Sequence, residues 1–385
     1  MFESKKKTLL FYIFTFLFVL HITPMLYVNA NFLGQYFNAT HVSIIYGVAA
    51  LIAILAIVGL RDKLRKFGNY KVFTRSIMIE MIALFVLIVS DSALIASLCF
   101  ITFFIIHTTT FISLDIFLEK HTQNTSTGTV RGWYLTTINA ATVLGPFLAS
   151  LFLTGGDFKK VYIFVLILLF PILFLAIEIF HTFKDSPYDK LKIWSSFMKV
   201  KKNTDLYSTL MANFILQLFY AWMVVYIPLY LYKFQNFSLS EITLILAVAL
   251  LPFPLVQSTL GKLADTKYGE KEMLVIGFVV LSFFTILISF IESSNISAWI
   301  AILFMTRVGA AMVELMTETH LFKRIDSGDL NVISLFRILT PAGYLIGTIL
   351  GTLFLYLVSF NMIFFILGGI VLYGLRYALT LTDTR

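Results

Sequence analysis

Apolar residues fill this chain in long runs that short polar segments interrupt. A helix needs about 20 predominantly apolar residues to cross a bilayer. Twelve runs reach spanning length, at about 8–31, 42–60, 73–90, 92–118, 132–153, 161–181, 206–232, 241–260, 273–291, 297–322, 331–358 and 361–380. The pattern predicts an all-α membrane protein with twelve transmembrane helices and almost no chain left over for a soluble domain.

The longest polar connection lies in the middle of the chain, between the sixth and seventh runs. We therefore expect an N-terminal six-helix bundle at 1–181, a cytoplasmic linker at 182–205 and a C-terminal six-helix bundle at 206–385. Within the linker, Leu191, Trp194 and Met198 recur at helical spacing among lysines. That pattern is typical of a short helix on an anionic lipid surface, and a flexible basic linker is an equal alternative.

The two halves repeat each other. Three polar residues of the fourth run recur 199 residues later in the tenth: Asp115, Glu119 and His121 correspond to Glu314, Glu318 and His320. Small residues at four-residue spacing also recur, as Ala141, Gly145 and Ala149 in the fifth run and as Gly343, Gly347 and Gly351 in the eleventh. Small residues at this spacing let two helices approach closely in lipid. Two repeated bundles are typical of a secondary transporter with its site at the membrane midplane.

Composition and charge fit this interpretation. Of the 385 residues, 59% are hydrophobic and 13% are charged, whereas soluble domains carry about 25% charged residues. With the N-terminus inside, the inner loops and their flanks hold 25 of the 29 lysines and arginines. This asymmetry predicts a multi-pass protein of the cell membrane with both termini cytoplasmic, and it explains the net charge of +8 without a nucleic-acid partner.

Other chemistry is sparse. The single cysteine permits no internal disulfide, and the six histidines show no paired spacing typical of a metal site. No phosphate-binding loop pattern is present, so ATP is not the expected energy source. We predict no metal and no cofactor, with a proton gradient as the energy source.

The tenth run, 297–322, carries charges at bilayer depth. Arg307 lies near its middle, and Glu314 and Glu318 follow within about 20° of Arg307 around a helix. A charge at this depth costs at least about 2.5 kcal/mol, so it normally faces a protein interior or a watery cavity. We favour a solute or proton site here; a buried ion pair that locks helices together is the alternative.

Two loops at equivalent places in the halves carry a family signature. After the eighth run, Gly261 and Asp265 are followed by basic residues and by Gly269, and after the second run Gly59 and Asp62 begin a looser version. These loops resemble the signature of the major facilitator superfamily, although Gly269 comes one position late and one basic residue is replaced. The resemblance covers the whole chain and implies the major facilitator fold.

The fifth run resembles the antiporter motif of the same superfamily. Gly132, Gly145 and Pro146 match it, and three further positions that usually hold glycine are filled by Ala141, Ala149 and Ser150. The resemblance implies an efflux antiporter, slightly ahead of uptake. Ordinary packing of small residues between helices is the alternative.

The resemblance also implies which spans line a central cavity: the first, fourth, seventh and tenth. The substrate-binding residues would then be Arg307 and Glu314 of the tenth span, His107 and Thr108 of the fourth, His21 of the first, and Asn213, Gln217 and Tyr220 of the seventh. The last three share one helical face because they are spaced i, i+4 and i+7.

Proton coupling is expected at Glu314, His107 or Glu80. Histidine titrates near neutral pH, which suits His107 to this role. Glu80 lies in the middle of the third run, where it either carries a proton or braces its neighbours as a hydrogen-bonded acid; the sequence favours neither.

Near the inner end of the fourth span, Asp115 and Glu119 lie close to Arg131. In relatives, acids at this point pair with basic residues of the loop signature as the two halves open and close. The resemblance therefore implies an inner gate; a purely structural ion cluster is the alternative.

These observations predict a monomeric, proton-coupled secondary active transporter of small organic solutes, working in a lipid bilayer by alternating access. Efflux by antiport is favoured, and uptake of a sugar, nucleoside or organic acid by proton symport is the alternative. A membrane sensor or scaffold that no longer transports is a second alternative. An enzyme is not expected, because no catalytic constellation is present.

Overall fold

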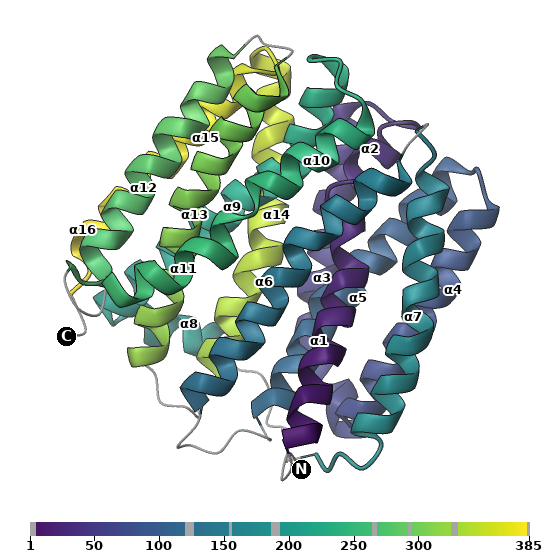
Figure 1. The fold of residues 1–385 in the computed structure, drawn as a ribbon. Helices are drawn as coiled ribbons and strands as arrows, with labels where there is room; N and C mark the ends of the chain where they lie inside the picture. Colours follow the sequence, from purple (N-terminus) through teal and green to yellow (C-terminus); the bar gives the residue numbers. More distant parts are fainter. Residues whose placement is uncertain are drawn as a thin grey trace. The chain divides into compact units, whose positions relative to one another are not determined.

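A computed structural model gives the fold of the chain, and it describes residues 5–119, 127–153, 156–185, 193–263, 268–291, 295–324 and 330–382. Across these described residues the chain is helical and contains no strand (Figure 1). The prediction of an all-α protein is confirmed.

The helices follow the predicted runs. In the N-terminal part they are α1 (Lys5–Leu26), α2 (Asn29–Leu33), α3 (Ala39–Phe67), α4 (Asn69–Val89), α5 (Ala93–Glu119), α6 (Thr127–Phe152), α7 (Phe158–Phe180) and α8 (Ile193–Lys201). They continue as α9 (Thr204–Lys233), α10 (Leu239–Ala249), α11 (Pro252–Leu263), α12 (Glu270–Leu287), the 3-10 helix η2 (Ile288–Phe290), α13 (Ile296–Arg324), α14 (Leu330–Leu357), α15 (Met362–Tyr373) and α16 (Leu375–Thr380).

Several spans consist of two helical pieces. The first span comprises α1 and α2, the eighth span comprises α10 and α11, and the twelfth span comprises α15 and α16. Eleven helical segments of the described chain are long and apolar enough to cross a membrane, and the shorter apolar segment Thr136–Phe152 of α6 occupies the remaining predicted position. The predicted count of twelve is therefore approximately supported.

The chain forms two compact units. The first contains residues 1–37, 48–190 and 238–247, and the second contains 38–47, 191–237 and 248–385. In the first unit α1 packs against α6 and α7, and α4 packs against α5 and α7 (Figure 1). In the second unit α9 packs against α14 and α15, and α12 packs against α13 and α15. Counted by span, these four pairings are the same in both units, as a duplicated chain predicts.

The small-residue positions lie where helices approach most closely. In the first unit a Cβ added to Gly145 of α6 would come within 2.7 Å of the backbone of Thr23 on α1. In the second, a Cβ on Gly343 of α14 would come within 2.7 Å of the backbone of Gln217 on α9. The close approach lets the side chain of Thr23 donate a hydrogen bond of 3.1 Å to the carbonyl of Ala141. Both stripes thus pack the first span of a unit onto its fifth.

The two signature loops end on equivalent glycines. Gly68 precedes α4 with φ 80° and ψ 155°, and Gly269 precedes α12 with φ 101° and ψ 164°. This backbone region is essentially restricted to glycine. In the first loop, the backbone amide of Asn69 donates to the carboxylate of Asp185 at 2.9 Å. The loops therefore need glycine as the residue that turns the chain into the next helix.

The described part of the linker contains one helix, α8. Its Val200 is fully buried in a cluster with Leu210 and Leu335, and Phe197 packs against the same cluster. The opposite face is open, since 74% of the surface of Trp194 is exposed. Leu191 lies outside the described residues. One face of the helix is thus docked on its own unit, while Trp194 and Met198 are exposed.

Candidate functional site

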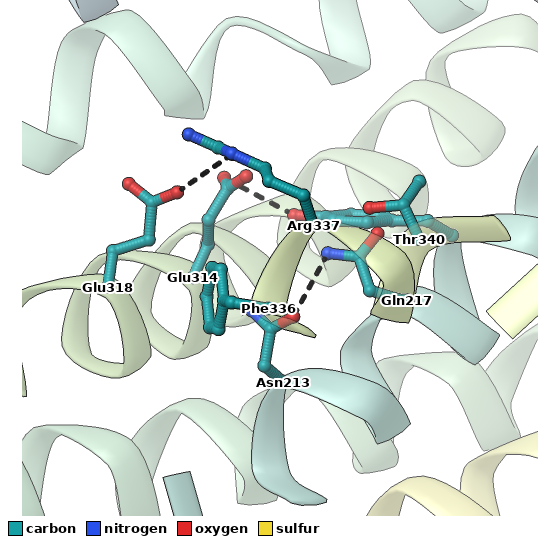
Figure 2. A pocket seen from close by; sticks show the side chains of 8 residues that line it. Asn213, Gln217, Glu314, Glu318, Phe336, Arg337 and Thr340 are labelled. Carbon is teal, nitrogen blue, oxygen red and sulfur yellow. Dashed lines mark hydrogen bonds and ion pairs between the residues drawn. The ribbon is translucent and has the colours of Figure 1, made fainter. Parts of the chain in front are cut away.

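A polar cavity of about 190 Å³ lies in the second unit. Its lining comes from α9, α13 and α14: Asn213, Gln217, Tyr220, Glu314, Glu318, Phe336, Arg337 and Thr340 (Figure 2). Polar groups inside a membrane span need partners or water, so a cavity lined by them is a place where a polar solute can bind.

Helix α9 presents its three polar side chains to this cavity because they share one face. Gln217 donates a hydrogen bond of 3.5 Å to the side-chain oxygen of Asn213 (Figure 2). Asn213 in turn donates one of 3.2 Å to the hydroxyl of Thr317. One turn further along, the hydroxyl of Tyr220 donates to a carboxylate oxygen of Glu314 at 3.4 Å. These bonds hold amide and phenol groups at the cavity wall.

The charged wall is formed by α13 and α14. Glu314 and Glu318 are one helical turn apart on α13, and Arg337 extends from α14 toward both carboxylates (Figure 2). The guanidinium lies 3.7 Å from the Glu318 carboxylate, and both side chains are partly exposed. The cavity thus offers two acids, one cation, two amides and one phenol to a bound molecule.

Arg307 lies elsewhere on α13. It is 1% exposed, its guanidinium stacks over the ring of Phe219 at 5.3 Å, and one of its terminal nitrogens has no hydrogen-bond partner among the described residues. It is not among the described residues that line the cavity. Of the two residues that the sequence analysis grouped in one site, Glu314 lines this cavity, and Arg307 packs against Phe219.

A second polar cluster lies in the first unit and joins three helices. His21 of α1 and His107 of α5 both point their Nε2 atoms at one carboxylate oxygen of Glu80 on α4, at 3.3 Å and 2.6 Å. One ligand-type atom from each of the three residues lies within 4.8 Å of the others. The two imidazole rings meet edge to face, with centroids 5.6 Å apart.

This cluster is buried and incompletely hydrogen-bonded. His21 and Glu80 are fully buried, and the His107 side chain is 16% exposed. Within the described residues, the second carboxylate oxygen of Glu80 and both ring nitrogens of His21 make no hydrogen bond. Buried polar atoms are nearly always hydrogen-bonded, so these three atoms are exceptions that call for a partner.

The other predicted residues that the structure describes are not members of either group. Thr108 bonds the carbonyl of Phe104 within its own helix, and Asp115 is half-buried further along α5. Asp265 lies outside the described residues, and so do the side chains of Glu119 and Arg131 and the surroundings of Gly132 and Gly261. Gly59 faces open space, while Asp62 is exposed and 3.8 Å from Arg65. Gly145 and Pro146 lie in α6, where Gly145 packs on α1.

Sequence reasoning placed Glu318 on the charged stripe of the tenth run without naming it as a substrate-binding residue. It assigned no role in the site to Phe336, Arg337 or Thr340. A signal for Arg337 was present, because it is a charged residue inside the predicted span 331–358. A position near the inner end of a span is, however, equally typical of a cytoplasmic basic residue. The direction in which Arg337 points depends on the rotation of α14, which hydropathy does not reveal.

Comparison with known proteins shows which family the chain matches. A family model described as Major Facilitator Superfamily matches residues 8–328 and, in a second match, residues 209–384. No curated protein sequence matches significantly. Among solved structures, a mutant of the nucleoside transporter NupG superposes with a TM-score of 0.75 at 14% identity, covering 98% of this chain and 100% of that one. A second NupG structure gives 0.73 at 14% identity, covering 97% of each chain. At this identity the likeness shows the fold.

Proposed function

Because this chain belongs to the major facilitator superfamily and is therefore a membrane transporter, we propose that it couples uptake of a small, nucleoside-like solute to proton entry. Transport proceeds by alternating access, and the energy comes from the proton gradient without a further cofactor. A single chain suffices for the cycle.

The observation that carries this proposal is the lining of the cavity in the second unit. Amide groups of Asn213 and Gln217 suit the donors and acceptors of a nucleobase or a sugar hydroxyl. The phenol of Tyr220 and the ring of Phe336 give an aromatic surface on which a flat base can pack. The resemblance in fold to NupG, described as a nucleoside transporter, supports the same choice of solute.

Glu314 is the residue that we assign to the coupling proton. Its carboxylate lies at the cavity beside the hydroxyl of Tyr220 and one turn from Glu318. Since two nearby carboxylates repel each other when both are ionised, one of them gains from holding a proton. A solute that bonds Tyr220 or Glu314 would therefore sense whether that proton is present. Roles for Glu80 and His107 in coupling stay predictions.

The test uses the full chain in proteoliposomes that contain a pH indicator. Adding a nucleoside outside should acidify the interior as protons enter with the solute, whereas sugars and organic acids serve as comparison solutes. If none of the candidate solutes acidifies the interior, nucleoside symport is contradicted. A chain that catalyses no flux at all would favour the sensor or scaffold alternative.

The coupling assignment has its own variants. Glu314→Gln keeps the shape of the side chain but cannot exchange a proton, so it should abolish acidification and concentrative uptake while leaving exchange of labelled solute across the membrane. Glu272→Gln is the matched control, because Glu272 is an exposed acid in the first turn of α12. If Glu314→Gln still accumulates solute against its gradient, the proton is carried elsewhere.

Efflux by proton antiport is the second candidate. Its support is Gly145 with Pro146 in α6, at the positions of the antiporter-type motif, where Gly145 packs directly against Thr23. In the same vesicles antiport has the opposite sign, since solute entering from outside would drive protons out and make the interior alkaline. The direction of the pH change therefore separates the two candidates.

A further inference from the structure

We propose that His21, Glu80 and His107 form a binding site for a divalent transition-metal ion, with Zn²⁺ as the best match. This site lies in the first unit and is independent of the proposed function. The sequence alone predicts no metal, because the three residues stand far apart on α1, α4 and α5.

The donor set suits zinc. Two imidazoles and one carboxylate with an open fourth position form a common three-ligand zinc site. Bond lengths of about 2.0–2.2 Å place neighbouring ligands of a tetrahedral ion about 3.3 Å apart. The Nε2 atom of His21 is 3.3 Å from Glu80, that of His107 is 2.6 Å from it, and the three donor atoms lie within 4.8 Å of one another. Small side-chain adjustments would bring all three around one ion.

Buried polar atoms without a hydrogen-bond partner also support a metal site here. Glu80 has one carboxylate oxygen without a hydrogen bond, and His21 has none at either ring nitrogen, although both residues are fully buried among the described residues. Only the two histidines lie within ion-pair distance of Glu80 in the described chain. A cation at the centre would supply the missing partner and neutralise the buried carboxylate.

Neighbouring aromatic rings hold the two imidazole rings in place, and an ion has access to the cluster from one side. The ring of Phe18 meets His21 edge to face at 4.8 Å, and Phe103 stacks beside His107 at 6.5 Å. The apolar shell keeps competing water away from the ligands. Because the His107 side chain is 16% exposed, an ion reaches the cluster from that side. Once bound, it would join α1, α4 and α5.

The test is direct metal binding to the purified full chain, with any affinity tag removed and bound metal stripped by a chelator. Titration with ZnCl₂ by calorimetry should show one ion per chain, and X-ray absorption of that complex should show two imidazoles at about 2.0 Å. Zn²⁺ should also raise the unfolding temperature, because an ion that binds only the folded chain stabilises it.

Variants separate this site from adventitious binding. Glu80→Gln preserves shape and should weaken binding at least tenfold, and the double change His21→Ala with His107→Ala should abolish it. His41→Ala and His181→Ala are matched controls at exposed histidines and should bind as the wild type does.

Three outcomes overturn the proposal: no zinc binding by the wild type, saturable binding that persists in the double variant, or a bound ion without imidazole ligands. The first of these would leave the cluster as a hydrogen-bonded group only. If the chain transports solute but binds no zinc, the metal-site proposal is wrong and the proposed function is unaffected. If the chain binds zinc but transports no solute, the proposed function is wrong and the metal-site proposal is unaffected.

Discussion

At the scale of single residues, the cavity combines two acids with one cation. Arg337 extends from α14 to within 3.7 Å of Glu318, and Glu314 lies on the same wall beside Tyr220 (Figure 2). Partly exposed ion pairs contribute little to stability, typically below about 1 kcal/mol. The pair therefore matters more for what the cavity binds than for folding.

Arg337→Ala should weaken solute binding at least tenfold while changing the unfolding temperature little, because the two carboxylates lose the cation that faces them. Adding Glu318→Gln should recover part of the loss, since it removes one of the repelling charges. A double-mutant cycle on binding affinity measures this coupling. Arg376→Ala, at an exposed arginine beside Tyr373, is the control and should behave as the wild type. Purely additive effects would show that Arg337 and Glu318 act independently.

Tyr220→Phe removes one hydroxyl and keeps the ring that lies 6.3 Å from Phe253. A single hydrogen bond contributes about 1 kcal/mol, so the KM for solute should rise about fivefold. Initial uptake rates in proteoliposomes measure it. Tyr356→Phe changes an exposed tyrosine and should have no effect. An unchanged KM in Tyr220→Phe would remove this hydroxyl from the solute site.

At the scale of helices, backbone contact between α1 and α6 and between α9 and α14 is the common feature of the two units. In both contacts glycine is required because a neighbouring backbone occupies the space of a side chain. In the second unit the close packing allows the indole nitrogen of Trp222 to donate a hydrogen bond of 2.6 Å to the carbonyl of Gly347. The stripes thus determine which helices pair.

Gly145→Ala should lower the unfolding temperature, since its new Cβ would come within 2.7 Å of the Thr23 backbone and force α1 and α6 apart. Overpacking of this kind costs about 1–3 kcal/mol. Gly59→Ala is the matched control, because no atom lies within 4 Å of the position of its Cβ and alanine favours a helix. Thermal unfolding in detergent compares them. Equal unfolding temperatures would mean that the α1–α6 contact tolerates a side chain.

At the scale of the whole molecule, the chain is a multi-pass membrane protein whose two units share one helix-pairing scheme. Its orientation in the membrane rests on the distribution of lysine and arginine. With both termini cytoplasmic, α8 would lie inside, and the connection between α9 and α10 would lie outside.

Cysteine labelling measures this orientation. The only native cysteine, Cys99, is buried, so Cys99→Ala gives a cysteine-free chain. On that background Phe234→Cys, at an exposed residue after α9, should react with a membrane-impermeant maleimide on intact cells. Trp194→Cys, at an exposed residue of α8, should react only after the cells are opened. The reverse pattern would place the termini outside.

Much of the fold was predictable because its causes are local in the sequence. Twelve apolar runs give the spans by length alone, and the small-residue stripe through Gly343 predicted close helix contact. The face of α9 with Asn213, Gln217 and Tyr220 was predictable too, since helical periodicity groups them without knowledge of their neighbours. Gly269 was identified from the loop signature, and its backbone conformation explains why glycine is needed there.

Tertiary structure alone decided which polar residues meet. His21 and His107 were predicted for the substrate site, and Glu80 and His107 for proton coupling. That all three meet follows from the packing of α1 with neighbours distant in sequence. Arg307 and Glu314 were predicted for one site. Arg307 stacks on Phe219, and the described lining of the cavity holds Arg337 together with Glu314. The reason is physical. Hydropathy fixes that a segment is a buried helix, whereas the rotation of that helix, and thus the partner of each buried charge, is set by side-chain packing against helices elsewhere in the chain.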